Sequence, residues 1–417
     1  MAAPAVEFTG GHQVRLLTGG DELFPAIAEA LQTAQQEVWM AFYIFSDDPA
    51  ARRVAEALAA TAARGVAVHV VVDGFGSNRR IATLRQWLAG SAVRLEVFRP
   101  LDRWWTWLQP GQLRRMHHKL CVVDGHCAFV GGINLIDDRF DINHGWSDTP
   151  RLDFALRIEG QAAEDARRLA QSLWMRAHLG RGWRGELRLL ARSAEPVNRT
   201  LRLLRGLRAS RPGDARQPHV APAKAPPVHA ALVVRDNLGH RRAIERAYIE
   251  AIGQATERID IACSYFYPGR AFRRALRRAA RRGVRIRLLM QGKIDYRLAG
   301  LAARVMYAEM LARGMRVFEY TPAFLHAKVA VVDGRWATVG SSNIDPLSLL
   351  LNLEANVVVR DEAFVADLSA QLERAFAASV EVTAPPVKPG LRGWASRGLV
   401  AWVATLYLRM AGISGPY

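Results

Sequence analysis

Residues 116–134, MHHKLCVVDGHCAFVGGIN, and residues 325–343, LHAKVAVVDGRWATVGSSN, carry one pattern of polar residues in two distant parts of the chain. The pattern His-x-Lys-x4-Asp-x6-Gly-x2-Asn aligns between them without a gap. In each stretch an apolar run ends at Asp-Gly, a pair typical of the tight turn of a β-hairpin. We therefore expect a strand–turn–strand unit in each half of a chain built by duplication.

The sequence before each motif repeats as well. It alternates apolar runs of strand length with amphipathic, helix-length segments that stop at glycine. The matching segments are 14–45 with 232–266, 50–74 with 270–292, and 93–100 with 315–322. This alternation predicts an α/β fold with two pseudo-symmetric α/β/α halves, each a mixed β-sheet flanked by helices, which share one active site.

We divide the chain into four parts. Residues 1–191 form the first half, 192–230 a basic, proline-rich linker, 231–385 the second half and 386–417 an amphipathic C-terminal segment. No stretch has the roughly 18–20 apolar residues that span a bilayer. Tryptophan and arginine together in the last segment favour an interfacial helix, and a helix docked on the core is the alternative.

The strand geometry indicates which histidine of the first motif matters. Residues two apart along a strand project to the same face. His117 therefore points with Lys119, and His326 points with Lys328, whereas His118 points away. The second motif has no histidine at the position that matches His118, so we expect His117 and His326 to be the catalytic pair.

The simplest use of two such motifs is one site at the axis between the halves. It would hold two histidines and a set of donors for phosphate oxygens, namely Lys119, Lys328, Asn134 and Asn343. Such a site suits a phosphodiester, because one imidazole attacks phosphorus while the other protonates the leaving alcohol.

Four acidic residues complete the candidate site. Asp124 and Asp333 belong to the catalytic motifs but are out of phase with the histidines, which favours a structural or a lysine-orienting role. An attacking imidazole also needs an acceptor for its other nitrogen. Asp153 and Glu354 follow the motifs at matching places and are the candidates for orienting the histidines, with ordinary strand-edge acids as the alternative.

Composition limits the function classes. The 417 residues are 50% hydrophobic and carry a net charge of +18, which favours nucleic acid, an anionic membrane surface or a phosphate substrate as partner. Three cysteines without a CxxC pair suit a reducing compartment, and the N-terminus lacks the pattern of a signal peptide. No zinc-type cluster or Walker loop is found, so we expect no metal and no cofactor.

These motifs resemble the phospholipase D superfamily, named for its duplicated HxKx4D motif with a trailing GxxN, over about residues 12–385. The segments 42–48, 130–138 and 340–357 are most similar to bacterial cardiolipin synthases of the B type. The resemblance implies the phospholipase D fold and a two-step exchange through a phosphohistidine. One histidine attacks a phosphatidylglycerol and releases glycerol, and the hydroxyl of a second phosphatidylglycerol then takes the phosphatidyl group.

The resemblance implies His117 as nucleophile and His326 as acid and then base, although the near symmetry of the site leaves the order open. Two departures stand out. HHK replaces the HRK expected of the subfamily, and residues 139–151 form an insertion before Asp153 that weakens the alignment of this acid.

The segment 103–115 sets Trp104, Trp105 and Trp107 beside arginines, a mixture that suits a bilayer interface; a loop packed on the core is the alternative. We expect a peripheral protein on the cytoplasmic side of the inner membrane and no nucleic-acid partner. Other hypotheses are a phospholipase D that uses water as acceptor, a nuclease of the same superfamily, for which the charge of +18 would bind phosphates, and a non-enzymatic scaffold, which predicts degenerate motifs.

Overall fold

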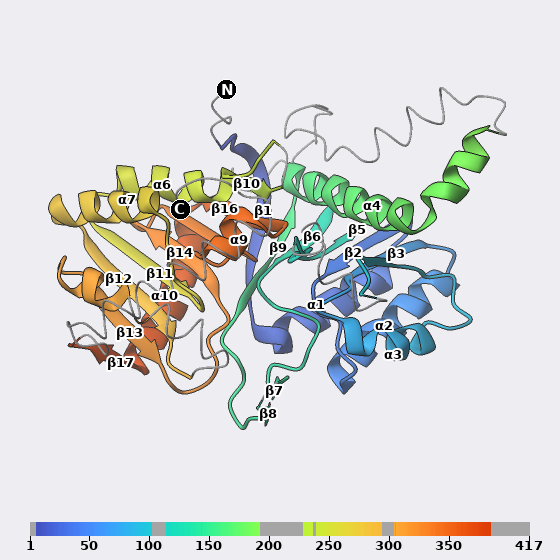
Figure 1. Cartoon of the computed structure of the whole chain (residues 1–417), viewed down its shortest axis with the longest axis horizontal. Coiled ribbons are helices and arrows are strands. Elements are labelled where there is room, and N and C mark those ends of the chain that lie inside the picture. The colour runs from blue at the N-terminus through green and yellow to red at the C-terminus, as the bar shows by residue number, and fades with distance from the viewer. Residues whose placement is uncertain are drawn as a thin grey trace.

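The computed structural model describes residues 6–101, 114–142, 144–191, 228–236, 239–293, 304 and 306–384. These residues form two halves with the same order of elements, drawn from blue to green and from yellow to red in Figure 1. The prediction of an α/β fold built from two duplicated halves is confirmed.

The first half comprises β1 (Thr9–Thr18), α1 (Gly19–Thr33), β2 (Glu37–Phe42), α2 (Pro49–Ala63), β3 (Ala67–Asp73), the 3-10 helix η1 (Asn78–Arg80), α3 (Ile81–Trp87), β4 (Arg94–Phe98), β5 (Lys119–Val123), β6 (Cys127–Gly131), β7 (Phe140–Asp141), β8 (Gly145–Trp146), β9 (Phe154–Glu159) and α4 (Gln161–Ala191).

The second half comprises β10 (Val228–Arg235), α6 (Ala243–Gln254), β11 (Arg258–Cys263), α7 (Arg270–Arg281), β12 (Arg285–Gln291), β13 (Arg316–Tyr320), β14 (Lys328–Val332), β15 (Trp336–Gly340), α9 (Pro346–Leu350), β16 (Glu354–Arg360), α10 (Glu362–Ala377) and β17 (Ser379–Val382).

The strands of each half form a mixed sheet, as predicted. In the first half β2, β3 and β4 are parallel, and β5, β6, β9 and β1 continue the sheet in antiparallel order on the other side of β2. The second half repeats this arrangement with β11, β12 and β13 parallel. The matching strands β5 and β14 therefore lie at equivalent places, and both motifs begin at equivalent strand ends.

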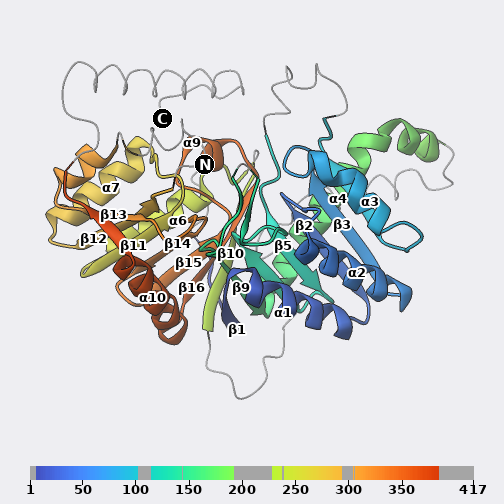
Figure 2. The ribbon, with the colours of Figure 1, turned by 90° about the horizontal axis from the view of Figure 1, so that it is seen from below.

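The two sheets are joined, which the sequence does not predict. β1 pairs antiparallel with β10, with Thr9 opposite Ala230 and His12 opposite Val228, so that 15 strands form one continuous sheet. Figure 2 shows these two strands side by side between the halves. A hydrophobic cluster also spans both halves and includes Leu156 of β9 and Val357 of β16. Joined strands and a shared core fix one half against the other.

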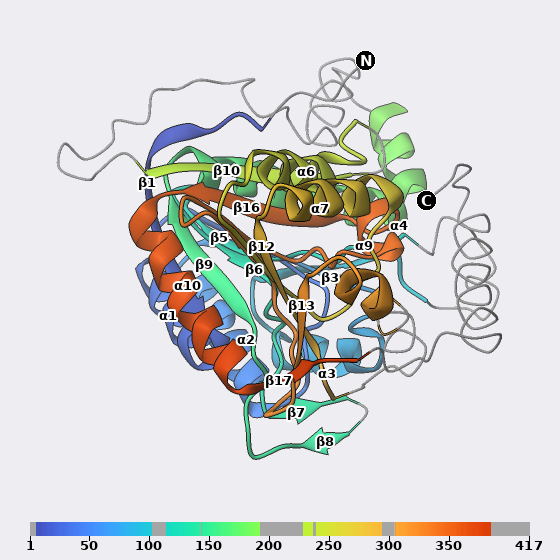
Figure 3. The same ribbon diagram turned by 90° about the vertical axis from the view of Figure 1, so that its left-hand side faces the viewer.

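Helices cover both faces of the second-half strands. Figures 2 and 3 show α6 and α7 on one face and α10 on the other. In α7 the apolar residues Phe272, Ala275, Leu276 and Ala279 are buried, as their helical spacing requires, and the arginines lie at other positions of the helix. Asp361 starts α10 by accepting a hydrogen bond from the Phe364 N–H (2.8 Å), the usual way to cap a helix.

Both Asp-Gly pairs form the predicted hairpin turns. Asp124 and Gly125 have φ of 50° and 73°, and Asp333 and Gly334 have φ of 49° and 65°. Positive φ at both central residues is the geometry of a type I′ turn, whose twist matches that of the two strands. These turns fix the register of each hairpin and with it the direction in which each histidine–lysine pair points.

Several predicted boundaries lie outside the described residues. Of the linker 192–230 only 228–230 are described, and they begin β10 instead of belonging to the linker. The segment 103–115 is described only at 114–115, and 386–417 lies wholly outside. Among the described residues no helix is long and apolar enough to cross a membrane.

Candidate active site

The start of each motif pairs with the segment before the acidic residue of the other half. The Leu353 N–H donates to the Arg115 carbonyl (2.8 Å), and the His117 N–H donates back to the Leu353 carbonyl (2.9 Å). The same exchange joins Leu152 to the second motif, with the His326 N–H donating to the Leu152 carbonyl (2.8 Å). Both motifs thus meet at the junction of the halves, as predicted.

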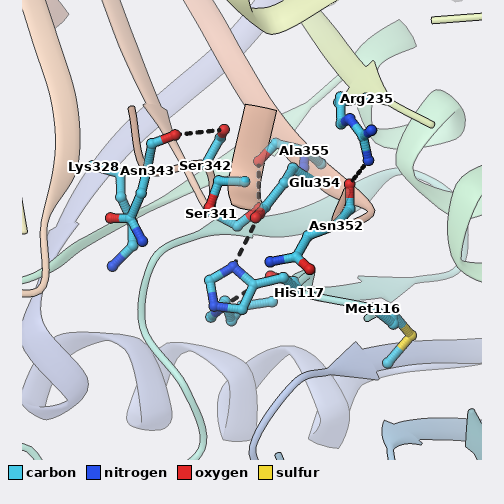
Figure 4. Close-up of polar contacts among 12 residues, drawn as sticks. Met116, His117, Arg235, Lys328, Ser341, Ser342, Asn343, Asn352, Glu354 and Ala355 are labelled. Carbon is cyan, nitrogen blue, oxygen red and sulfur yellow. Dashed lines mark hydrogen bonds and ion pairs between the residues drawn. The ribbon is translucent and has the colours of Figure 1, made fainter. Parts of the chain in front are cut away.

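Because of this pairing, each histidine is oriented by a carboxylate from the opposite half. His117 Nδ1 lies 3.0 Å from Glu354 Oε2, as Figure 4 shows. His326 Nδ1 lies 2.6 Å from Asp153 Oδ2. Asp153 and Glu354 thus lie where we expect residues that orient the histidines. The sequence did not predict that each acid would contact the histidine of the opposite half. In each ring the Nδ1 contact leaves Nε2 as the atom for chemistry.

The lysines of both motifs are buried beside the histidines. Lys119 Nζ donates to the His117 carbonyl (2.9 Å), and Lys328 Nζ donates to the His326 carbonyl. Burial lowers the pKa of Lys119 to about 7, and the positive charge of Lys328 acts in the same direction. Burial lowers the pKa of Lys328 as well. A bound phosphodiester would reverse this effect, because a nearby anion favours the charged lysine.

The two asparagines of the motifs are both buried. Asn134 and Asn343 are 4% and 6% exposed. Asn134 Oδ1 accepts the Ile44 N–H (3.3 Å), and Asn343 Oδ1 accepts the Cys263 thiol (3.8 Å). These contacts occupy the carbonyl end of each amide, so the nitrogen end is the one that can donate to phosphate. Figure 4 shows Asn343 beside Lys328.

His118 is more deeply buried than His117. Its side chain is 1% exposed, and burial lowers its pKa to about 3, so the ring is neutral. His117, in contrast, has a side chain that is 12% exposed and lies edge-on to Tyr43 at 4.7 Å between ring centroids. The geometry agrees with His117 as the functional member of the pair.

Asp124 and Asp333 require a correction. Asp124 accepts the backbone N–H groups of residues 35–37 at 2.8–2.9 Å, and Asp333 accepts those of residues 256–258 at 2.7–2.9 Å. Both lie beyond the far end of a strand from the lysines, about 16 Å along an extended chain of five residues. They neither reach the phosphate site nor orient the lysines, and they hold the chain in front of β2 and β11.

The two histidine–carboxylate pairs differ in charge. Burial acts to raise the pKa of Glu354, but His117, Lys119 and the Ser341 hydroxyl, which donates to Glu354 Oε2 (2.6 Å), outweigh it and hold the pKa below its usual value. Glu354 is therefore ionised. Burial lowers the pKa of His117, against the influence of Glu354, so the ring is neutral and ready to attack.

Asp153 has the opposite shift. Burial raises the pKa of its carboxyl to about 7, although Lys328 and the Phe154 N–H act against it. Burial, followed by the charges of Lys328 and Arg151, holds the pKa of His326 well below its usual value. Near neutral pH this pair gains or loses a proton easily.

The two carboxylates also differ in one hydrogen-bond donor, which comes from the glycine pair that sequence analysis assigned only to close backbone approach. Ser341 of the second half corresponds to Gly132 of the first. A Cβ at Gly132 would lie 2.3 Å from Asp153 Oδ1, so a side chain there would displace the Asp153 carboxylate, and the glycine offers it no hydroxyl. Tyr43 and Asp73, whose Oδ2 accepts the Met116 N–H (2.9 Å), also belong to the site, and no repeat marks them in the sequence.

Two histidine–lysine motifs that meet across duplicated halves define a member of the phospholipase D superfamily. The sequence model of the family described as "Cardiolipin synthase, PLD-like domain" matches residues 27–146 and 248–377, which is more than half of the chain. The chain belongs to this family. The first matched segment ends before Asp153, in the insertion at 139–151, and the second includes Glu354.

Curated relatives agree. The chain is 34% identical over 385 residues to cardiolipin synthase B of Escherichia coli (strain K12), covering 92% of this chain and 85% of that protein. It is 32% identical to cardiolipin synthase A of Pseudomonas fluorescens (strain SBW25), covering 89% and 70%. Phosphatidylserine synthase of Haemophilus influenzae Rd KW20 shares the fold, with a TM-score of 0.65, 13% identity and coverage of 96% and 95%.

Proposed function

We propose that the protein is a phosphatidyltransferase that joins two molecules of phosphatidylglycerol into cardiolipin and releases glycerol. The observation that carries this proposal is the pair of histidines held by carboxylates from opposite halves beside two buried lysines. Membership of the cardiolipin synthase family and its curated relatives support the same reaction.

In the first step, His117 Nε2 attacks the phosphorus of the donor lipid. A nitrogen–phosphorus bond forms, the bond from phosphorus to the glycerol oxygen breaks, and His326 protonates the leaving oxygen. The lysine ammonium groups and asparagine amides bind the phosphate oxygens, where negative charge develops in the transition state. Lys119 lies close enough to His117 for this role, since its Nζ donates to the His117 carbonyl (2.9 Å).

In the second step, a hydroxyl of the acceptor lipid replaces glycerol. His326 takes the hydroxyl proton, the oxygen attacks phosphorus, and the bond to His117 breaks. The same pair thus gives one proton and then takes one. A carboxyl with a pKa of about 7 behind His326 suits this alternation, because the pair changes its proton content at little cost near neutral pH.

The difference between the pairs supports the order of roles. An ionised Glu354 fixes His117 in the tautomer whose Nε2 carries a lone pair and stabilises the positive charge that the ring acquires as it attacks. Asp153 can hold a proton itself, which favours acid–base work at His326. His117 is therefore assigned as nucleophile, and His326 as acid and base.

We further propose that the protein works as a peripheral protein at the cytoplasmic face of the inner membrane. Trp104, Trp105 and Trp107 lie outside the described residues, as does 386–417, and both segments combine tryptophan with arginine, a mixture that suits a bilayer interface. Co-sedimentation with phosphatidylglycerol vesicles tests it. Replacing the three tryptophans with alanine should weaken binding, and binding equal to that of the unmodified protein would contradict the proposal.

The reaction itself is tested with purified protein and phosphatidylglycerol vesicles, by following lipids and free glycerol with mass spectrometry. We expect one cardiolipin for each glycerol released. Phosphatidic acid as the sole lipid product would show a hydrolase instead, and intact lipid together with cleaved DNA would show a nuclease.

A further inference from the structure

Arg151 is the last residue of the insertion that precedes Asp153, and its guanidinium is held inside that insertion. The Arg151 Nη2 donates to the Phe140 carbonyl (3.1 Å) and lies 3.5 Å from Asp141 Oδ2. The Arg151 N–H donates to the Asp138 carbonyl (2.8 Å). Figures 1 and 3 show the hairpin of β7 and β8, to which Phe140 and Asp141 belong, projecting from the body of the protein. The side chain of Arg151 is 11% exposed, so most of it is shielded from water.

The backbone places Arg151 next to the second catalytic histidine. The following residue, Leu152, donates its N–H to the Phe324 carbonyl (2.9 Å) and accepts the His326 N–H (2.8 Å). This bridge keeps the segment extended, and residues two apart in an extended segment project to the same face. Arg151 and Asp153 therefore leave the chain on one face, and Asp153 Oδ2 lies 2.6 Å from His326 Nδ1. Arg151 is thus directed to the side of the chain on which the ring of His326 lies.

The charge of Arg151 acts on this site. Burial is the main cause that lowers the pKa of His326, followed by the charges of Lys328 and Arg151. Arg151 also acts to lower the pKa of Lys328, for which burial is again the main cause. The other charged groups that face His326 are Asp153, Lys119 and His117. A positive charge beside an imidazole disfavours the protonated ring and makes that ring a stronger acid.

The equivalent position in the second half carries no charge. Aligning Asp153 with Glu354 places Asn352 at the position of Arg151. The Asn352 carbonyl accepts the guanidinium of Arg235, as Figure 4 shows. Arg235 lies opposite Glu354 in the antiparallel pair of β10 and β16, and directly opposed residues project to one face of a sheet. Each half therefore supplies an arginine from a different place, and only the arginine of the first half comes from the segment that also carries the orienting acid.

We propose that Arg151 is a positioning residue that keeps His326 a strong acid, so that the imidazolium readily gives its proton to the leaving oxygen. The proposal rests on the proposed phosphatidyl transfer, in which glycerol leaves in the first step. The proton passes from His326 Nε2 to the glycerol oxygen as the bond from phosphorus to that oxygen breaks. Arg151 forms no bond in this step, and its fixed charge favours the neutral ring that remains.

The first turnover of phosphatidylglycerol vesicles tests this role. Arg151→Gln removes the charge, which raises the pKa of His326 and makes its protonated ring a weaker acid. Glycerol release should therefore slow about threefold at pH 6. The gap should close towards pH 8.5, because the weaker acid keeps its proton to a higher pH.

Two further variants serve as controls for the charge. Arg151→Lys keeps the positive charge and should stay within about twofold of the unmodified protein at each pH. Arg139→Gln removes an arginine from the same insertion, where its side chain is 41% exposed and lies 3.4 Å from Asp21. It should match the unmodified protein at each pH.

A second donor separates this role from a structural one. The p-nitrophenyl ester of phosphatidic acid has a leaving group that needs no acid, so its first turnover should be equally fast in Arg151→Gln and in the unmodified protein. Equal slowing with both donors, or a ratio of glycerol release that does not change with pH, would overturn the role. Thermal unfolding identifies a variant that fails to fold, and Arg151→Met, which keeps an apolar stem without the charge, then takes the place of Arg151→Gln.

Failure of the proposed function gives a different result. If the unmodified protein forms phosphatidic acid alone, water is the acceptor, and transfer to a second lipid is overturned. Glycerol still leaves in the first step, so a ratio that changes with pH would continue to support Arg151. Intact phosphatidylglycerol after incubation with the unmodified protein would overturn both.

Discussion

The two histidine–carboxylate pairs have the same geometry and different charge. Glu354 receives a hydroxyl from Ser341 and stays ionised, whereas Asp153 stands against Gly132 and has a pKa of about 7. The halves differ in the acid itself, Glu354 against Asp153, and in the neighbouring residue, a serine in one half and a glycine in the other. The difference shows how a nearly symmetric site can give its two histidines separate roles.

The largest expected effect comes from removing either ring. His117→Ala and His326→Ala should each reduce turnover by about 10³-fold or more, because one loses the nucleophile and the other the proton donor. His118→Ala is the matched control and should keep most of the activity, since that ring is buried and strand alternation directs it away from His117. Glycerol release from phosphatidylglycerol vesicles measures all three. An inactive His118→Ala beside an active His117→Ala would reverse the assignment.

Replacing each carboxylate with an amide should change the rate with a different pH dependence in the two pairs. Asp153 is mostly protonated below its pKa of about 7, so Asp153→Asn should change the rate little at pH 6 and increasingly above pH 7, where the ionised form is lost. Glu354, with its lowered pKa, is ionised at both values. Glu354→Gln should therefore cost about 10²-fold throughout. Rates measured between pH 5.5 and 8.5 test this, and identical profiles for the two variants would contradict it.

Ser341→Gly should make the His117–Glu354 pair resemble the His326–Asp153 pair. Loss of the hydroxyl raises the pKa of Glu354, so the rate should fall about tenfold and the fall should be steepest on the acidic side. Ser342→Ala is a neighbouring control, because the Ser342 hydroxyl donates to the Asn343 carbonyl (3.2 Å) and not to Glu354. An unchanged pH profile in Ser341→Gly would mean that the serine does not set the difference.

The smallest effect on catalysis is expected at Asp124. Asp124→Ala removes the acceptor for three backbone N–H groups and should lower the free energy of unfolding by about 1–3 kcal/mol, with the turnover number unchanged. The pKa of Asp124 is lowered by these N–H groups, against the effect of burial. Its contribution is therefore present at neutral pH and is lost as the pH falls through the lowered pKa. Urea unfolding and a rate assay on the same sample separate this role from a catalytic one.

The sequence predicts much of this arrangement. The gapless repeat predicts the duplicated halves, and strand alternation selects His117 over His118 without any structure. Asp124 and Asp333 are out of phase with the histidines along the strand, which indicates that they do not share the role of the histidines. The sequence does not reveal which groups they bind, because the backbone N–H groups that Asp124 accepts, in residues 35–37, lie almost 90 residues earlier in the chain.

The exchange of carboxylates between halves is not predictable from the sequence. Asp153 follows His117 and Glu354 follows His326 along the chain, so spacing alone pairs each acid with its own half. The β-bridges between Met116 and Leu353 and between Leu152 and Leu325 instead bring each acid to the histidine of the opposite half. These bridges form only when the two sheets meet. The pairing of β1 with β10 escapes prediction for the same reason.

The most direct test of the shared site uses a donor whose leaving group needs no acid, such as the p-nitrophenyl ester of phosphatidic acid. We expect His326→Ala to release about one equivalent of p-nitrophenol per protein and then stop, with the phosphatidyl group on the peptide that carries His117. We expect no such burst from His117→Ala. A burst from His117→Ala, or full turnover by either variant, would contradict a catalyst made of two histidines at one phosphorus atom.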